Sequence, residues 1–222
     1  RGTNTTQSRV NRANRKSEFS LHDAEFLAAA AYLVSDRSTY PHADFKSAWR
    51  LVCLNQFHDI IPGSSIGPVY DEALEQYGAI AEIATRTRDD ALGLLSAELG
   101  GDLLLINPTA FSRDELVILP DGVNHADGQE LKGGKLVSLG EISPYTVKPF
   151  NRASLPDGPE CEPVTVSSGL LENGFLRVEI NEAGDITRIC DKVNQREVLP
   201  KGAFANQFQA FDDRPLSWDA WD

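Results

Sequence analysis

Residues 92–108, "LGLLSAELGGDLLLINP", contain the point at which the pattern of the sequence changes. Before Gly100 the apolar residues recur at helical spacing, and after Gly101 they form a short continuous run typical of a strand. Two adjacent glycines end a helix because glycine readily adopts the left-handed conformation that closes it. We therefore predict an α+β fold, with helices before this point and β-structure after it.

Three helices are expected before Gly100, joined by short connections and packed as a bundle. The first begins at Ser20, which forms a capping pattern with Asp23 and precedes an alanine-rich segment. The second begins at Pro41, a residue suited to a first helical turn, and continues to about Phe57. Phe45, Trp49 and Val52 recur at helical spacing along this second helix, and Cys53 and Phe57 are expected in the core on the same side as Phe45 and Trp49.

The third helix is expected to start at Ser64 or Ser65, with Pro68 in its first turn, and to continue towards Leu99. Its apolar stripe is formed by Val69, Ala73, Leu74, Tyr77, Ile80, Ala81, Ala84 and Leu92. Such a stripe predicts that one side of the helix packs against the other two.

The rest of the chain is predicted to form antiparallel strands, arranged as β-sandwich segments. The runs "DLLLINP" (102–108), "ELVILP" (115–120) and "YTVKPF" (145–150) are short, apolar and bounded by turn residues. The stretch "FLRVEINEAGDITRICD" (175–191) alternates with period two around a turn at Gly184, which predicts a hairpin. The expected domains are a connector (1–19), a three-helix middle domain (20–100), a small β domain (101–150), a linker (151–163) and the start of a C-terminal β-sandwich domain (164–222).

Composition and charge limit the classes of function. The hydrophobic content of 41% is that of an ordinary globular protein, and no apolar run approaches the roughly 18 residues of a membrane span. A net charge of −12 argues against a nucleic-acid binder, although the chain begins with a basic arm of Arg1, Arg9, Arg12, Arg15 and Lys16 against Glu18. We interpret this arm as a solvated connector. The alternative, a nucleic-acid adaptor, predicts a salt-dependent affinity for DNA.

Two further features of the sequence indicate whether the chain is part of a larger protein and in which redox compartment it lies. The chain has no methionine and begins inside a polar segment, from which we expect an internal piece of a larger protein. Its three cysteines, Cys53, Cys161 and Cys190, show no paired metal spacing. We therefore expect a reduced, cytoplasmic protein in which Cys53 belongs to the core.

The candidate site lies in "LNQFHDIIPGSS" (54–65), where four polar side chains precede the helix-breaking pair Pro62-Gly63. One interpretation is structural: His58 complements the negative end of the helix dipole, and Asp59 caps a turn. The other is chemical: His58 binds a metal ion as a neutral imidazole, and Asp59 accepts hydrogen bonds from a polyol. One histidine does not make a metal site, and the others lie in different segments: His22, His42 and His125.

Three stretches resemble glycoside hydrolase family 38, the class II α-mannosidases. "LNQFHDIIPGSSIGPVYDEA" (54–73) resembles the signature at the start of that family's helical middle domain. "RGTNTTQSRVNRANRKSE" (1–18) is similar to the segment that closes its catalytic barrel, and "DDRPLSWDAWD" (212–222) to a stretch of its C-terminal β region. The three occur in the family's order, so the resemblance covers nearly the whole chain.

The resemblance implies a fold and an activity. Enzymes of this family carry an N-terminal α/β barrel, a three-helix bundle and β-sandwich domains, and they are retaining, zinc-dependent exo-mannosidases. His58 then corresponds to the histidine that the middle domain contributes to zinc, and Asp59 to the adjacent carboxylate that binds the sugar's hydroxyls. Asn55 and Gln56 would support their loop.

The same resemblance implies what this chain lacks. The nucleophile, the acid/base and the remaining zinc ligands are expected upstream, in the barrel whose tail is residues 1–19, so no catalytic residue is assigned here. The chain alone is therefore expected to be inactive and to hold no zinc. The expected partners are an α-mannoside and the chain's own barrel domain, with a homo-oligomer left open.

The sequence departs from the family at Asn4, where an aromatic residue is usual. One alternative function is a carbohydrate-binding or interaction module without catalysis, in which Trp218 and Trp221 form a platform for a sugar. A titration with mannosides discriminates between this alternative and the enzyme.

Overall fold

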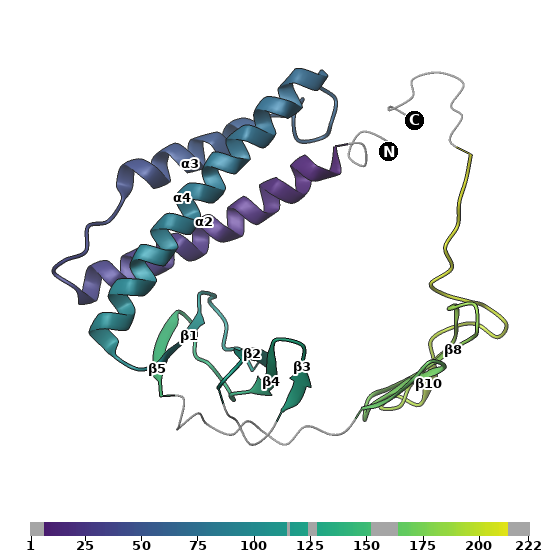
Figure 1. Cartoon of the computed structure of the whole chain (residues 1–222). Coiled ribbons are helices and arrows are strands. Elements are labelled where there is room, and N and C mark those ends of the chain that lie inside the picture. Colours follow the sequence, from purple (N-terminus) through teal and green to yellow (C-terminus); the bar gives the residue numbers. More distant parts are fainter. Residues whose placement is uncertain (1–6, 115, 124–127, 152–163, 213–222) are drawn as a thin grey trace. The chain divides into compact units, whose positions relative to one another are not determined.

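The computed structural model describes residues 7–114, 116–123, 128–151 and 164–212 (Figure 1). They form two compact units, the first extending to residue 151 and the second beginning at residue 164. The first unit contains α2 (Ser8–Val34), α3 (His42–Asn55), α4 (Gly67–Leu99), β1 (Leu103–Asn107), β2 (Leu116–Pro120), β3 (Gln129–Leu131), β4 (Gly134–Ser138) and β5 (Thr146–Phe150). The second contains β6 (Thr165–Ser167), β7 (Leu170–Glu172), β8 (Leu176–Ile180), β9 (Ile186–Asp191) and β10 (Arg196–Glu197). Among the described residues, no helix is long and apolar enough to cross a membrane.

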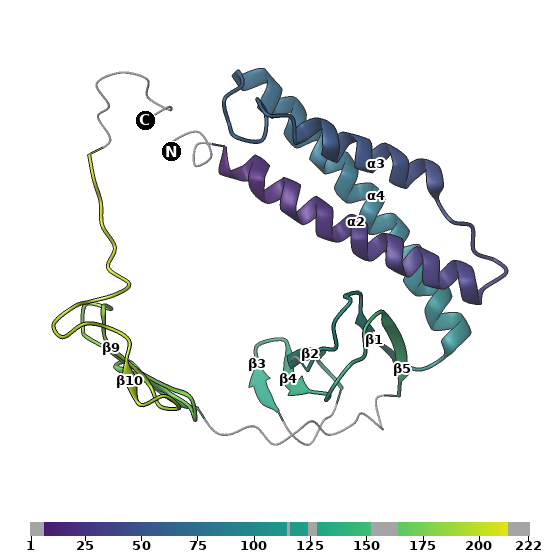
Figure 2. The same ribbon diagram turned by 180° about the vertical axis from the view of Figure 1, so that it is seen from behind.

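The three helices pack on one another, and the predicted bundle is confirmed (Figure 2). Leu21 of α2, Val52 of α3 and Ile80 of α4 meet in one core cluster, each with 1% or less of its surface exposed. Full burial of side chains of this size stabilises a fold by about 1.5–3 kcal/mol each. Apolar packing therefore holds the bundle together.

The first helix begins much earlier than the sequence pattern indicated. α2 starts at Ser8, so the predicted start at Ser20 was wrong. No glycine or proline interrupts residues 8–34, and the buried positions Val10 and Ser17 continue the core stripe towards the N-terminus. The residues interpreted as the end of a connector are thus part of the amphipathic helix.

The buried face of α3 is rotated from the predicted one. Cys53 is exposed, and Phe57 lies beyond the helix with 50% of its surface exposed, so both predictions of core positions were wrong. Steps of four residues turn a helix by about 400°, so a stripe at every fourth residue drifts by about 40° per step. Alternating steps of three and four stay on one face, and the buried residues are Phe45, Ala48, Val52 and Asn55.

α4 begins at Gly67, two to three residues after the predicted start at Ser64 or Ser65, and its C-terminal end follows the prediction. Pro68 lies in its first turn, and the helix ends at Leu99, where Gly100 takes a φ of 72°. At Gly101 a Cβ atom would lie 2.9 Å from the carbonyl oxygen of Phe150, so a side chain there would collide with β5. Of the predicted stripe, Ala81 is exposed. The buried residues are Tyr70, Ala73, Tyr77, Ile80, Ala84, Thr87, Ala91 and Leu95.

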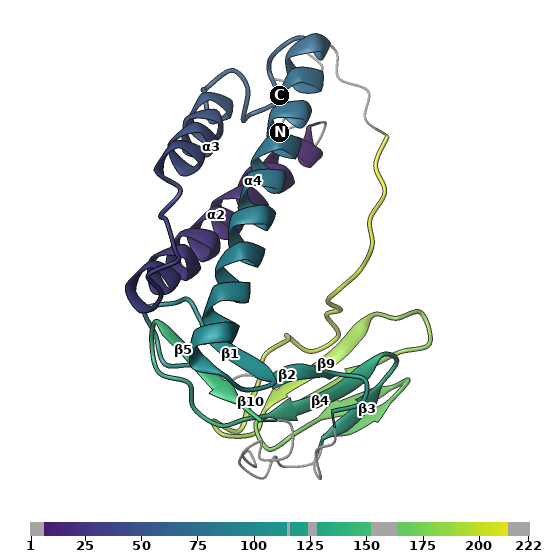
Figure 3. The ribbon, with the colours of Figure 1, turned by 60° about the vertical axis from the view of Figure 1, so that its left-hand side comes forward.

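The strand that follows the two glycines lies between two layers. Leu104 and Ile106 of β1 pack against Leu27 and Leu95 of the helices, and Figure 3 shows β1 and β5 beside the C-terminal end of α4. Leu103 and Leu105 face the other way, against the core cluster of the sheet β2-β4-β3. Because both faces of β1 are covered, its sequence is apolar throughout rather than alternating.

The second unit is one antiparallel sheet of five strands in the order β10-β9-β8-β7-β6. The predicted hairpin is confirmed, since β8 pairs with β9 across a turn in which Gly184 has a φ of 87°. None of the described residues of this unit is fully buried. A single sheet needs a covered face to form a core, so the expected sandwich stays a prediction.

The sequence pattern missed some of the strands. The strands β3, β4, β6, β7 and β10 were not recognised in the sequence, and all described strand pairs are antiparallel. Some predictions concern residues outside the described ranges. These are most of the predicted linker (152–163), Asn4, His125, Cys161 and the two tryptophans of the proposed platform, Trp218 and Trp221.

Candidate functional site

The C-terminal end of α3 is joined to α4 by the buried amide of Asn55. The 3–4 spacing of the buried stripe carries Asn55 into the bundle, where only 1% of its surface is exposed. Its Nδ2 donates to Oε1 of Gln76 at 2.9 Å, and Nε2 of Gln76 donates to Oε1 of Glu72 at 2.9 Å. A buried amide requires such partners, so the contact fixes the last residue of α3.

The next residue, Gln56, is joined to α2 instead. Its Nε2 donates to Oε1 of Glu18 at 2.8 Å and to Oδ1 of Asn14 at 3.1 Å. Oδ1 of Asn14 also accepts a hydrogen bond from the hydroxyl of Tyr77 at 3.2 Å. Burial, together with the nearby Glu18 carboxylate, raises the pKa of Tyr77 to about 12, so this hydroxyl keeps its proton and can donate. Side chains of α2, of α4 and of the residue that follows α3 therefore meet at Asn14.

A tight turn follows, built on one carbonyl group. The backbone N–H groups of Ile60 and Ile61 both donate to the carbonyl oxygen of Phe57, at 2.8 and 3.1 Å. Pro62 has no N–H group with which to continue a helix, and Gly63 takes a φ of 93° that reverses the chain. The local sequence thus dictates a short turn rather than a longer helix.

The far end of the turn is anchored to the start of α4. The backbone N–H of Ser65 donates to the hydroxyl oxygen of Tyr70 at 2.6 Å. Tyr70 belongs to the bundle core, with 4% of its surface exposed. We define residues 57–64 as the His58 turn; bundle side chains hold the chain on both sides of it.

His58 and Asp59 occupy the exposed middle of this turn. Their side chains are 77% and 59% exposed, and His58 Nε2 lies 3.4 Å from Asp59 Oδ2. The ring of Phe57 lies beside the imidazole, with the two centroids 4.2 Å apart. His58 therefore lies at the surface beside Asp59, and the chemical roles of the two residues remain predictions.

Within the described ranges, no group of three or more His, Cys, Asp or Glu side chains could hold a metal ion. His22 Nδ1 lies 3.1 Å from Asp23 Oδ1 on α2, and the ring of His42 packs on Tyr40 at 4.6 Å. Neither histidine is brought to His58. If His58 binds a metal ion, further ligands must come from beyond the described residues.

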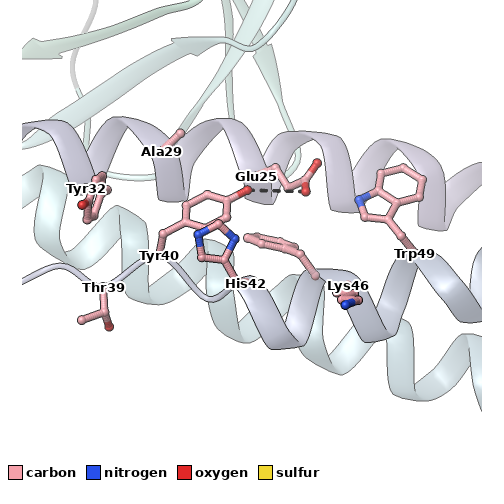
Figure 4. A pocket seen from close by; sticks show the side chains of 9 residues that line it. Glu25, Ala29, Tyr32, Thr39, Tyr40, His42, Lys46 and Trp49 are labelled. Carbon is pink, nitrogen blue, oxygen red and sulfur yellow. Dashed lines mark hydrogen bonds between the residues drawn. The ribbon is translucent and has the colours of Figure 1, made fainter.

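A cleft of about 820 Å³ lies between α2 and α3, away from the His58 turn (Figure 4). Its floor includes Ala29 of α2, and Tyr40 donates to Oε1 of Glu25 at 3.5 Å across it. Burial and the neighbouring Glu25 carboxylate raise the pKa of Tyr40. The sequence pattern gave no sign of the cleft, because its lining combines two helices and the loop between them: Glu25, Ala29, Tyr32, Thr39, Tyr40, His42, Phe45, Lys46 and Trp49.

Comparison with known proteins places these elements in one family. The sequence model of the alpha mannosidase middle domain matches residues 1–95, which include the three helices up to the last turn of α4 and the His58 turn. The model of the glycosyl hydrolases family 38 C-terminal domain matches residues 171–222. The chain therefore belongs to glycoside hydrolase family 38.

Curated relatives agree along the whole chain. Alpha-mannosidase 2C1 of Homo sapiens is 35% identical over 234 residues, covering 100% of this chain and 21% of that protein. Alpha-mannosidase of Saccharomyces cerevisiae is 31% identical over 230 residues, covering 100% of this chain and 18% of that protein. The chain thus spans about a fifth of the length of these relatives.

A solved structure has a similar fold. The crystal structure of a protein in glycosyl hydrolase family 38 from Enterococcus faecalis aligns with a TM-score of 0.62 and 19% identity, over 85% of this chain and 29% of that one. At this identity the likeness concerns the fold, and it agrees with an α+β arrangement of helices and antiparallel sheets.

Proposed function

We propose that this chain is part of a retaining, zinc-dependent α-mannosidase that hydrolyses terminal α-mannosides of oligosaccharides or mannosyl conjugates. The relatives reported above are named as α-mannosidases, and the match to the middle domain includes the His58 turn. The observation that carries the proposal is the exposure of His58 and Asp59 on a turn held at both ends. Polar side chains presented on a fixed turn are typical of sites that act on a partner or ligand.

His58 is proposed as one zinc ligand. Neutral imidazole is a ligand type that zinc prefers, and 77% exposure leaves the ring open to an approaching ion. Catalytic zinc sites use about three protein ligands. The donor chemistry of His58 therefore fits zinc as one member of a shared site, completed by the barrel domain. When bound, the ion acts as a Lewis acid on oxygen atoms of the sugar.

Asp59 is proposed to bind hydroxyl groups of the terminal sugar. An ionised carboxylate accepts hydrogen bonds through both oxygens, and those bonds are stronger than bonds between neutral groups. Because Asp59 follows His58 directly and its carboxylate lies beside the imidazole, it can bind the same sugar that the ion contacts.

The catalytic barrel is proposed to cover this end of the bundle. Several large apolar side chains in or next to the His58 turn are at least half exposed: Leu54, Phe57 and Ile66. Exposed apolar side chains grouped in one region support contact with another domain. In this proposal the barrel supplies the nucleophile and the acid/base. The five-stranded sheet is proposed to form one layer of a β-sandwich. The cytoplasmic location stays a prediction of the sequence, and the oligomeric state is left open.

Assays of the full-length protein test the proposal. It should release phenol from a chromogenic aryl α-mannoside with retention of configuration, lose activity to a chelator and regain it with zinc. The 222-residue chain alone should release no phenol and bind no stoichiometric zinc. A full-length protein without activity on α-mannosides, or turnover by the 222-residue chain, would contradict the account.

A second candidate function is carbohydrate binding without catalysis, which the cleft between α2 and α3 favours. The rings of Tyr40 and Trp49 line it beside the carboxylate of Glu25 and the ammonium group of Lys46 (Figure 4). Aromatic faces with a few polar groups suit a pyranose, which has an apolar face and a rim of hydroxyls. Titration with a mannobiose, followed by the NMR signal of the Trp49 indole, tests this candidate. Binding that survives Trp49→Leu would place the sugar elsewhere.

A further inference from the structure

The His58 turn has an exposed middle and anchored ends. On one side, Asn55 donates to Gln76 of α4 at 2.9 Å and Gln56 donates to Glu18 of α2 at 2.8 Å. On the other side, the Ser65 backbone N–H donates to the Tyr70 hydroxyl at 2.6 Å. The segment between these contacts is short, so the bundle determines where it can lie.

Two adjacent amides have a directional effect that apolar residues would lack. Successive side chains on a helix diverge by about 100°, so neighbours can reach different helices. Apolar side chains at positions 55 and 56 would pack without a fixed direction, whereas hydrogen bonds require a narrow range of distance and angle. The amides therefore fix the rotation and the position of the end of α3.

We propose that Asn55, Gln56 and Tyr70 are positioning residues, which hold the His58 turn in the direction that the zinc site requires. This inference rests on the proposed function of His58 and adds the contacts through which the bundle sets its orientation. A ligand on a loose turn must lose conformational freedom when the ion binds, and this loss weakens binding. Anchoring the turn in the folded protein removes much of that cost.

Two variants remove the anchors while keeping the side-chain size. Gln56→Met deletes both donated hydrogen bonds of an exposed residue, and Tyr70→Phe deletes only the hydroxyl that accepts from Ser65. Each has a matched control away from the turn. Arg86→Met breaks the 2.8 Å contact with Asp44, which joins α4 to α3 near the start of α3. Tyr40→Phe removes a hydroxyl that donates to Glu25.

Amide hydrogen exchange in the 222-residue chain tests the anchoring itself. In Gln56→Met and Tyr70→Phe, the amides of residues 57–65 are expected to exchange about tenfold faster, while those in the middle of α2 and α4 keep their rates. The two controls should leave residues 57–65 unchanged. Unchanged exchange in both anchor variants, or faster exchange throughout the bundle, would overturn the proposal.

Zinc affinity of the full-length protein, measured by competition with a chelator, tests the consequence. Loss of a contact that orients a ligand typically weakens metal binding by about tenfold or more, and excess zinc should then restore turnover. If the contacts of Gln56 and Tyr70 were purely structural, Gln56→Met and Tyr70→Phe would lower the melting temperature, as is expected of the controls, and would leave the zinc affinity unchanged. That result would overturn the inference. His58→Ala separates the two claims. If His58→Ala loses zinc while both anchor variants keep full zinc affinity, the positioning role is rejected and the proposed function stands. If His58→Ala keeps normal zinc, the proposed function itself is rejected.

Discussion

His58 Nε2 lies 3.4 Å from Asp59 Oδ2, and both side chains are exposed at the surface of the bundle. α3 ends at Asn55, so His58 lies beyond the last turn of the helix. The structural interpretation, in which His58 complements the helix dipole, requires a position within that last turn because the effect falls off beyond it. An exposed pair of this kind also contributes little to stability.

The first prediction follows from that exposure. His58→Ala and Asp59→Asn should each change the free energy of unfolding of the 222-residue chain by less than about 0.5 kcal/mol, as is usual for surface substitutions. Denaturant unfolding followed by helical circular dichroism measures the change. A loss of about 2 kcal/mol in His58→Ala would match a strong helix-terminus contribution and favour the structural interpretation.

The second prediction separates the roles of the two residues in the full-length protein. Asp59→Asn should keep zinc and lower turnover by about 10- to 100-fold, because it weakens hydrogen bonds that a charged acceptor makes to the sugar. Elemental analysis and the aryl mannoside assay give the two quantities. Asp23→Asn, in the exposed pair with His22, is the control. Zinc lost in proportion to turnover would instead make Asp59 a metal ligand.

The third prediction concerns Asn107, at the end of β1. Its side chain is 1% exposed, and Nδ2 reaches the carbonyl oxygens of Phe111, Ile142 and Ser143 at 2.7, 3.2 and 3.0 Å. Asn107→Ala should destabilise the chain by about 2–4 kcal/mol, since it leaves buried groups without partners. Urea unfolding measures this loss. Asn194→Ala, which removes an exposed amide bonded to Asp191, should cost far less.

The fourth prediction is a loss of stability of the five-stranded sheet in acid. Hydrogen bonds from Lys192, Arg177 and Arg188 are the main cause of a lowered pKa in three carboxyl groups: Glu172, Glu179 and Glu197. A lowered pKa in the folded state gives stability that is present above the ordinary Glu value of 4.5 and is lost as the pH falls through the folded value. The urea concentration at which the β8 and β9 amides lose half of their protection should therefore fall as the pH is lowered below 4.5. A midpoint that stays constant, or an equal fall in Glu197→Gln, would contradict this explanation.

Periodicity in the sequence predicted the elements that are long or sharply bounded. The bundle, the stop at Gly100-Gly101 and the hairpin at Gly184 all rest on local rules of helix, turn and strand chemistry. The start of α2 was missed because Ser20 resembles a cap although the stripe continues before it. Strands of two or three residues, such as β10, show no period at all, because their pairing depends on partners distant in sequence.

The site could be found only in part. His58 and Asp59 were identified from a motif, and their exposure follows from the turn chemistry of Pro62 and Gly63. The contacts of Gln56 with α2 and of Ser65 with Tyr70 could not be predicted, because they depend on how the helices pack rather than on spacing along the chain. The rotation of α3 that buries Asn55 and exposes Cys53 has the same origin.

Zinc content and turnover of the full-length His58→Ala protein test the central claim most directly. His22 is a matched control, since it also lies next to an aspartate on the bundle and its side chain is 50% exposed. The account predicts that His58→Ala loses most of its zinc and that its turnover of an aryl α-mannoside falls by more than about 100-fold, because a lost ligand exceeds the effect of a lost supporting contact. His22→Ala should keep both. A His58→Ala protein with normal zinc and a normal rate would contradict the account.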